Sequence, residues 1–315
     1  MSGPATHRRG TDAMPANGQD VDPGFPGTLP FGVRLAAAMD ERGPLCVGID
    51  PHAGLLRAWG LEDTPSGLRD FALRTVEAVG GRVAAVKPQS AFFERHGSAG
   101  MAVLEETLAA LRETGTLAIL DVKRGDIGST MGGYAEAYLA DGAPLAADAV
   151  TLSPYLGYGS LAPALDLAAA TGRGVFVLAL TSNPEGAAVQ HARPNGHEGA
   201  GRAVAAAVVD GVTSSNAAAR ASGVLGSVGL VVGATVGSAV RDLGIDLVAS
   251  GAPLLAPGVG AQGAGPAELE KVFGRARRQV LASTSRGVLG AGPEVVALRR
   301  AARDAAEQVT TALRR

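Results

Sequence analysis

Three charged side chains follow short apolar runs in a pattern that predicts an ammonium–carboxylate cluster at the ends of neighbouring strands. Asp121 and Lys123 come directly after one apolar run, and Lys87 ends the run before it. Side chains alternate along a strand with a period of two, so Asp121 and Lys123 are expected on one side and Val122 on the other. In a barrel of sequential strands, Lys87 becomes their direct neighbour. Gly125 then permits a sharp exit from the strand.

The chemistry of this cluster favours proton donation. A single Asp-x-Lys pair is most simply interpreted as a stabilising ion pair. Burying charges costs on the order of several kcal/mol per ion, however, so three charges at one strand edge favour a catalytic role. A lysine beside carboxylates is held in its charged form, because opposite charges favour ionisation. Lys123 is therefore suited to donating a proton rather than to forming a Schiff base.

The elements that must position these charges form eight repeating units. Short runs rich in Val, Leu and Ala alternate with longer stretches of helical spacing such as 98–113 and 293–313. The runs show little polar alternation, as expected for parallel strands that are covered on both faces. We predict an α/β fold, a closed (β/α)8 barrel, although a doubly wound open sheet has the same periodicity. The predicted strands are 45–49, 83–87, 117–121, 149–152, 175–180, 229–232, 254–256 and 280–283.

Composition bounds the remaining possibilities. Of 315 residues, 46% are hydrophobic and 18% charged, which supports a large core, and residues 31–315 are expected to form a single barrel domain. Residues 1–30, rich in Gly, Pro and Asp, are expected to be a disordered tail without a signal or membrane segment. The net charge of −2 argues against nucleic-acid or anionic-membrane partners. The only cysteine, Cys46, lies in an apolar run as an inert thiol, and a cytoplasmic location fits.

Two loops carry further candidate residues. The long segment 184–199 contains His191 and His197 without Cys or acidic partners at metal-ligand spacing, so no metal site is expected there. The string GVGAQG at 258–263 matches the dinucleotide fingerprint Gly-x-Gly-x-x-Gly. It follows the seventh strand, however, and no acidic residue lies about twenty positions later. This context favours a phosphate site shared with the loop after strand eight, with Gln262 and Arg286 as the candidate side chains.

The segment DVKRGDIGST at 121–130 resembles the Asp-x-Lys-x-x-Asp motif of orotidine 5′-phosphate decarboxylases, in the form found in the bacterial group with longer chains. The resemblance extends from about Phe31 to the C-terminus. Further matching strings are CVGIDPH at 46–52, VKPQ at 86–89, LTSNPEG at 180–186 and APGVGAQG at 256–263. Several ordered motifs in one chain make coincidence an inadequate explanation.

The resemblance implies a carboxy-lyase that converts orotidine monophosphate to uridine monophosphate and carbon dioxide in pyrimidine biosynthesis, without a metal or organic cofactor. It implies a homodimer in which Lys87, Asp121 and Lys123 of one subunit meet Asp126 of its partner. Lys123 would protonate C6 by direct decarboxylation, and Asp121 would face the substrate carboxylate. Lys87 and Asp126 would hold the network and the ribose hydroxyls.

The resemblance also assigns binding roles outside the charge network. Asp50 would bind ribose, and Ser182 the pyrimidine. Ile127 and Thr130 would reach across the subunit interface with Asp126. The phosphate would be bound by Gly258, Gly260, Gln262 and Arg286.

Two alternatives stay open at the level of sequence. Metal-dependent sugar-phosphate decarboxylases and hexulose-phosphate synthases are phosphate-binding barrels with the same Asp-x-Lys-x-x-Asp spacing. The strings at 86–89 and 180–186 favour the nucleotide substrate over these. A non-catalytic barrel that senses a nucleotide is the other alternative, and the presence of Lys123 argues against it.

Overall fold

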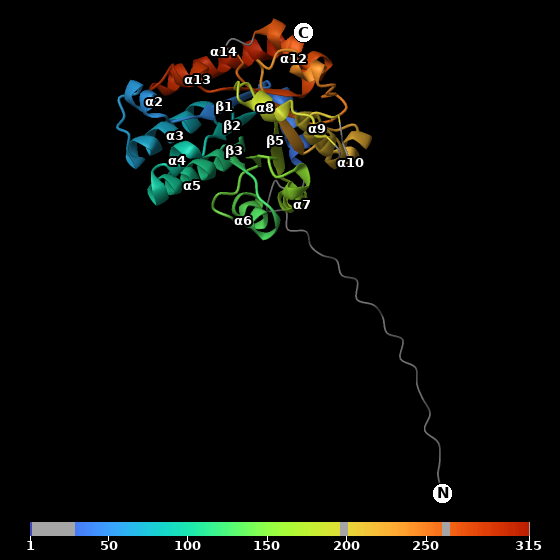
Figure 1. The fold of residues 1–315 in the computed structure, drawn as a ribbon. Helices are drawn as coiled ribbons and strands as arrows, with labels where there is room; N and C mark the ends of the chain where they lie inside the picture. Colours follow the sequence, from blue (N-terminus) through green and yellow to red (C-terminus); the bar gives the residue numbers. More distant parts are fainter. Residues whose placement is uncertain (2–28, 196–200, 260–264, 315) are drawn as a thin grey trace.

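Eight parallel strands close into a barrel in the computed structural model, which describes residues 1, 29–195, 201–259 and 265–314 (Figure 1). Each strand pairs in parallel with the next along the chain, and β8 pairs with β1 to close the ring. The predicted (β/α)8 barrel is confirmed and the open-sheet alternative is wrong. The strands are β1 (Leu45–Ile49), β2 (Ala85–Pro88), β3 (Leu117–Arg124), β4 (Ala149–Leu152), β5 (Gly174–Leu180), β6 (Val228–Val232), β7 (Leu254–Pro257) and β8 (Val280–Thr284).

Helices follow the strands and cover the outside of the barrel. In Figure 1, α3–α5 lie on one side of the barrel, α9 and α10 on the opposite side, and α14 along a third. The helices are α1 (Phe31–Arg42), α2 (Ala53–Ala58), α3 (Pro65–Val79), α4 (Ala91–Glu94), α5 (Gly97–Glu113), α6 (Gly128–Leu139), α7 (Ala162–Ala170), α8 (Gly186–Gln190), α9 (Val204–Ser215), α10 (Ala217–Ala221), α11 (Ala239–Asp242), α12 (Pro266–Phe273), α13 (Arg286–Leu289) and α14 (Val295–Arg314), with 3₁₀ turns η1 (Tyr158–Leu161) and η2 (Gly274–Gln279).

Local sequence explains where helices begin. The helix α3 starts after Thr64, whose hydroxyl accepts a hydrogen bond from the backbone N–H of Gly67 at 3.3 Å. Pro65 occupies the first helical position, where a backbone N–H would have no hydrogen-bond partner within the helix, so proline costs nothing there. The imidazole of His52 caps α2 in the same way by accepting from Leu55 N. These caps fix how the chain leaves the strand β1 and enters the outer layer.

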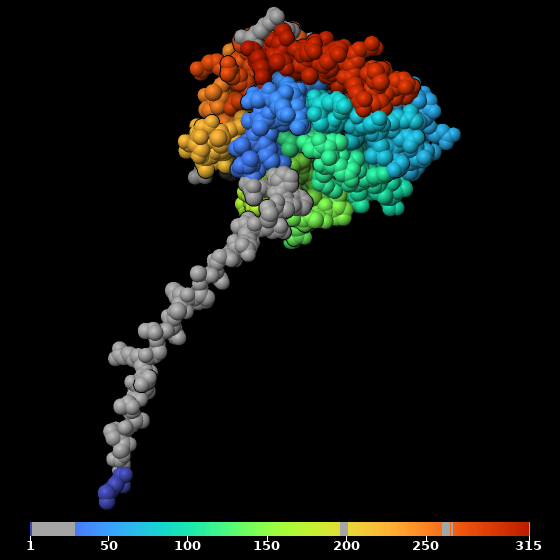
Figure 2. Space-filling model, turned by 180° about the vertical axis from the view of Figure 1, so that it is seen from behind, coloured from blue at the N-terminus to red at the C-terminus, as the bar shows by residue number. Residues whose placement is uncertain are grey.

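The helix α1 closes the amino-terminal end of the barrel, and the sequence analysis did not predict it. Its apolar face packs against side chains from the early parts of the strands, in a buried cluster that includes Cys46. Phe31 meets Phe176 edge to face with ring centroids 5.9 Å apart. Gly174 makes room for this ring, because a Cβ there would lie 2.2 Å from Phe31. Figure 2 shows α1, in blue, at the centre of this face beneath α14 in red.

Other predictions for the outer regions have mixed outcomes. The tail predicted for residues 1–30 lies almost wholly outside the described residues. The segment predicted as a long loop at 184–199 contains α8 at its start, His191 is exposed, and His197 lies outside the described residues. Within the described ranges, no helix combines the length and apolar character that a membrane span requires.

Cys46 is fully buried, and this burial raises the pKa of its thiol to about 12, as expected for an inert side chain.

Candidate active site

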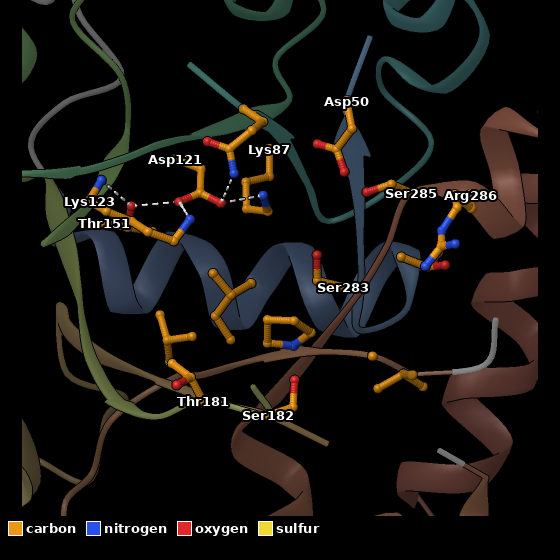
Figure 3. Close-up of a pocket in the computed structure, with 18 of the residues that line it drawn as sticks. Asp50, Lys87, Asp121, Lys123, Thr151, Thr181, Ser182, Ser283, Ser285 and Arg286 are labelled. Carbon is orange, nitrogen blue, oxygen red and sulfur yellow. Dashed lines mark hydrogen bonds and ion pairs between the residues drawn. The ribbon is translucent and has the colours of Figure 1, made fainter. Parts of the chain in front are cut away.

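A cavity of about 550 Å³ opens at the carboxyl ends of the strands, the end where barrel enzymes carry their chemistry. Both the barrel strands and the loops that follow them contribute to its walls (Figure 3). Seven of the predicted site residues line it: Asp50, Lys87, Asp121, Lys123, Ser182, Gly258 and Arg286. Lys87, Asp121 and Lys123 lie toward one end of the cavity in Figure 3. Arg286 lies at the other end, and Asp50 lies between them.

Asp121 is the centre of the charged end. Its Oδ2 accepts a hydrogen bond from Lys87 Nζ at 2.6 Å and one from Gln89 Nε2 at 2.9 Å. Its Oδ1 accepts from Lys123 Nζ at 2.6 Å and from the Thr151 hydroxyl at 2.8 Å. The predicted contacts between the two lysines and this carboxylate are therefore confirmed. Four donors on two oxygens fix the carboxylate in one orientation.

Lysine is rare in this chain, and two of its lysines lie in this site. The sequence contains only three lysines, Lys87, Lys123 and Lys271, among 28 basic residues counted as Lys or Arg. Two of the three converge on Asp121. An ammonium group can release a proton, whereas a guanidinium stays protonated in proteins. The choice of lysine over arginine at these two positions therefore matches a site that moves protons.

Burial and charge act in opposite directions on this network. Burial lowers the pKa of Lys87, but the carboxylates of Asp121 and Asp50 outweigh burial and hold that pKa above its usual value. Burial likewise raises the pKa of Asp121, and the ammonium groups of Lys87 and Lys123 overcome it and hold the pKa well below its usual range. Both groups are therefore charged at neutral pH. The site presents a fixed carboxylate between two cations.

The backbone that carries Lys123 departs from regular strand geometry. Lys123 has φ 47°, and it is the only non-glycine residue with a positive φ in the described ranges. That left-handed conformation costs a residue with a side chain about 1–2 kcal/mol. The strand ends at Arg124, directly before Gly125, where a sharp exit was predicted. Gly125 does not have a positive φ, and its missing Cβ instead allows close packing, because a Cβ would lie 2.2 Å from the carbonyl oxygen of Ser153.

The middle and far end of the cavity offer groups for an anionic, hydroxyl-bearing ligand. The Oδ1 atom of Asp50 is buried and has no hydrogen-bond partner among the described residues. Arg286, at the start of α13, is exposed at the cavity rim beside Ser285. Gly258 has φ 94° and turns the chain at the end of β7. The predicted phosphate ligands Gly260 and Gln262 lie outside the described residues.

Comparison with known proteins agrees with this geometry. Residues 43–301 match the orotidine 5′-phosphate decarboxylase / HUMPS family. The chain belongs to this family. It is 62% identical over 272 residues to the orotidine 5′-phosphate decarboxylase of Salinispora arenicola, covering 86% of this chain and 94% of that protein. It is 58% identical to the corresponding protein of Streptomyces coelicolor, covering 90% of this chain and 98% of the relative.

A solved structure supports the same assignment. A crystal structure from Streptomyces avermitilis, of a protein assigned as an orotidine 5′-phosphate decarboxylase, superposes with a TM-score of 0.85 at 56% identity. The match covers 92% of this chain and 98% of that one. This chain therefore has the fold of the decarboxylase family over nearly its whole length.

Three residues of the decarboxylase-family motif do not line the cavity of a single chain: Asp126, Ile127 and Thr130. Asp126 Oδ1 accepts a hydrogen bond from the backbone N–H of Ile127 at 2.8 Å. The Ile127 side chain is 62% exposed. Their predicted role across a subunit interface stays a prediction.

The sequence analysis missed two polar residues that touch Asp121. Gln89 was noted only as part of a matching string, and Thr151 was not noted at all. Thr151 is 1% exposed and lies in the strand β4 beside the motif that identifies the decarboxylase family. A polar residue near the end of an otherwise apolar strand was the available signal.

Proposed function

We propose that this protein is an orotidine 5′-phosphate decarboxylase, which converts orotidine monophosphate to uridine monophosphate and carbon dioxide for pyrimidine biosynthesis. The observation that carries the proposal is the Lys87–Asp121–Lys123 network at one end of the cavity, in a chain that belongs to the decarboxylase family. The relatives that carry this name are 62% and 58% identical to the chain. Substrate, reaction and mechanism are argued below from the residues of the site.

The proposed reaction proceeds by direct decarboxylation. The bond between C6 of the pyrimidine and its carboxylate breaks, carbon dioxide leaves, and the electron pair stays on C6. The Lys123 ammonium stabilises this carbanion and then transfers a proton from Nζ to C6. Asp121, between the two lysines, orients Lys123 and faces the departing carboxylate. Lys87 neutralises Asp121 from the buried side.

Magnitudes indicate which effect dominates. Two like charges about 4 Å apart at an effective dielectric near 20 repel by about 4 kcal/mol. The largest enzymatic accelerations require on the order of 20 kcal/mol. Repulsion between Asp121 and the substrate carboxylate therefore cannot be the main contribution. Stabilisation of the developing carbanion by a preorganised ammonium accounts better for the larger share.

The two ends of the cavity fit the two ends of the nucleotide. The pyrimidine would lie against the charged network, and apolar side chains of Leu178, Val231 and Leu255 would exclude water there. The buried, unpartnered Oδ1 of Asp50 would accept a hydrogen bond from a ribose hydroxyl. Arg286 at the far end would bind the phosphate, because a guanidinium matches the geometry of a phosphate dianion.

A homodimer with shared active sites completes the proposal. The loops after β3 and β4 contact each other where Gly125 packs on Ser153. These loops expose large apolar side chains, and the exposed fractions of Ile127, Tyr155 and Leu156 are 62%, 81% and 52%. Apolar groups of this size on adjacent loops favour a protein interface. Asp126 lies beside Ile127 and would enter the partner's cavity.

The decisive test adds orotidine monophosphate to protein purified in a chelator and follows the ultraviolet absorbance of the orotate chromophore. Loss of that absorbance, with uridine monophosphate as product, is the expected result. Absence of turnover under these conditions would contradict the proposed reaction.

The same assay separates the metal-dependent alternative. Both oxygens of Asp121 already accept two hydrogen bonds each, which leaves little capacity to bind a divalent cation. Within the described ranges, no group of three or more His, Cys, Asp or Glu side chains could hold a metal ion. Turnover that appeared only after addition of magnesium or manganese would favour the alternative.

A further inference from the structure

We infer that Thr151 is a positioning residue of this active site, whose hydroxyl fixes both the backbone of Lys123 and the carboxylate of Asp121. The inference rests on the proposed decarboxylase function and assigns a role to a residue outside the charged motif. Thr151 lies on β4, is 1% exposed, and makes both contacts from one oxygen atom. Figure 3 shows it beneath the network, between Asp121 and Lys123.

The need for this residue originates in an irregularity of the strand β3. Leu120 pairs with Val150 and Arg124 pairs with Leu152. Asp121, Val122 and Lys123 therefore face the single residue Thr151. Extra residues of this kind interrupt the ladder and leave backbone groups without their regular partners. A partly buried backbone N–H in such a region needs another acceptor.

The Thr151 hydroxyl supplies that acceptor. Lys123 N donates to Thr151 Oγ1 at 3.0 Å, and the hydroxyl donates to Asp121 Oδ1 at 2.8 Å. A hydroxyl has one proton to donate and lone pairs to accept, so both bonds form at once. The side chain thus links the backbone of the proposed proton donor to the carboxylate that its own ammonium contacts.

The link matters because Lys123 occupies a conformation that side-chain-bearing residues rarely adopt. Its φ of 47° is the single such case among the described non-glycine residues. Backbone outliers persist only where surrounding contacts hold them, and they concentrate at functional sites. Without the bond to Thr151, Lys123 can relax toward an ordinary strand conformation. Its ammonium would then move relative to Asp121 and to C6 of the substrate.

The test compares Thr151→Val, which keeps the shape and removes the hydroxyl, with Thr151→Ser, which keeps the hydroxyl. The valine variant is expected to lose about 100-fold in kcat, the effect of a displacement of about 1 Å at a reacting centre, with KM close to the wild-type value. The serine variant is expected to recover most of the activity. Thr107→Val is the matched control, because Thr107 is equally buried and its hydroxyl donates to Val103 O within the helix α5, outside the active site.

A second readout does not depend on turnover. Hydrogen exchange of the Lys123 amide, followed by NMR, should be slow in the wild type and in Thr151→Ser and much faster in Thr151→Val. If Thr151→Val does not fold, Thr151→Ala replaces it in both measurements. Wild-type kcat in a folded variant that lacks the hydroxyl, or equal exchange at Lys123 in all variants, would overturn the inference. If the wild type does not decarboxylate the substrate, only the proposed function fails, and the exchange comparison still decides whether Thr151 holds Lys123.

Discussion

Asp121 is held by four hydrogen bonds from four different side chains, and two of those donors are ammonium groups. A buried carboxylate so bound cannot rotate when a substrate arrives. Its charge therefore faces the same place in the free protein and in the complex. Such preorganisation avoids the cost of turning dipoles during the reaction.

Removal of the Lys123 ammonium should abolish catalysis but not folding. We expect Lys123→Ala to lose about 1000-fold or more in kcat, because both the stabilising charge and the proton source disappear. The side chain is 47% exposed, so its loss leaves no large cavity. Circular dichroism and binding of uridine monophosphate should stay near wild type. Lys271→Ala, the third lysine and exposed on α12, is the control and should retain full activity.

An unfolded Lys123→Ala protein would instead indicate that the network serves stability. The measurement therefore distinguishes the catalytic interpretation from the purely structural one.

The charge network also predicts how stability depends on pH. The pKa of Asp121 is lowered by Lys87 and Lys123 against burial, so its stabilising effect is present above the unfolded value near 3.8 and is lost as pH falls through the lower folded value. The pKa of Lys87 is raised, so its effect is present below about 10.5 and is lost as pH rises through the folded value.

Asp121→Asn should therefore destabilise the protein by an amount that does not change between about pH 5 and pH 9. We expect about 3–5 kcal/mol, because Lys87 stays buried and charged without the carboxylate that it contacts, and only the more distant charge of Asp50 remains. Urea unfolding of both proteins across this range measures the difference. A difference that changed steeply near neutral pH would contradict the assigned ionisation states.

Sequence order was enough to predict the Lys87–Asp121–Lys123 contacts, because consecutive barrel strands are neighbours and their carboxyl ends meet at one edge. It was not enough to predict Thr151. The alternation of side chains along β3 was predicted for a strand with regular pairing. The extra residues opposite Thr151 interrupt that pairing. Lys123 reached its predicted partner through a left-handed backbone that alternation alone does not describe.

At the scale of elements, strands were more predictable than short helices. The strands β1 and β4 have the predicted bounds, whereas β3 extends three residues beyond the predicted end at Asp121. The helix α8 has only five residues, too few for a periodic signal. The helix α1 did carry a signal, since its buried apolar residues at 31, 35, 38 and 39 follow helical spacing.

The helix α1 offers a test that separates stability from catalysis. Phe31 is fully buried in the apolar cluster under α1 and does not itself line the cavity. Phe31→Ala should reduce the free energy of unfolding by about 3–5 kcal/mol, the usual cost of removing a buried aromatic ring. Thermal or urea unfolding measures the loss, and kcat at low temperature should stay unchanged.

Val296→Ala on α14, where the side chain is 75% exposed, is the matched control and should leave stability nearly unchanged. A Phe31→Ala variant of wild-type stability would show that α1 does not hold the barrel closed.

At the scale of the whole molecule, the proposed homodimer predicts complementation between inactive chains. Lys123→Ala and Asp126→Ala are each expected to be inactive. After subunit exchange, an equal mixture should regain about one quarter of the wild-type activity, because about half of the dimers are mixed and each holds one complete site. Mass spectrometry of isotope-labelled chains confirms that exchange has occurred.

A mixture of Lys123→Ala with Lys87→Ala provides the control. Both side chains come from the same chain's cavity, so no mixed dimer can contain a complete site. Recovery in this control, or no recovery in the first mixture despite exchange, would contradict a site shared between subunits.

The scarcity of lysine makes this chain suited to direct spectroscopic observation of its proposed proton donor, Lys123. Protein produced with nitrogen-15-labelled lysine would carry only three labelled side chains, and two of these form ion pairs with Asp121. The Lys271→Ala protein assigns the exposed one, and the Lys123→Ala protein assigns the proposed donor. In heavy water, deuterium would pass from the labelled Nζ of Lys123 to C6 of the product, and its appearance there could be followed in the same tube as the ammonium signals.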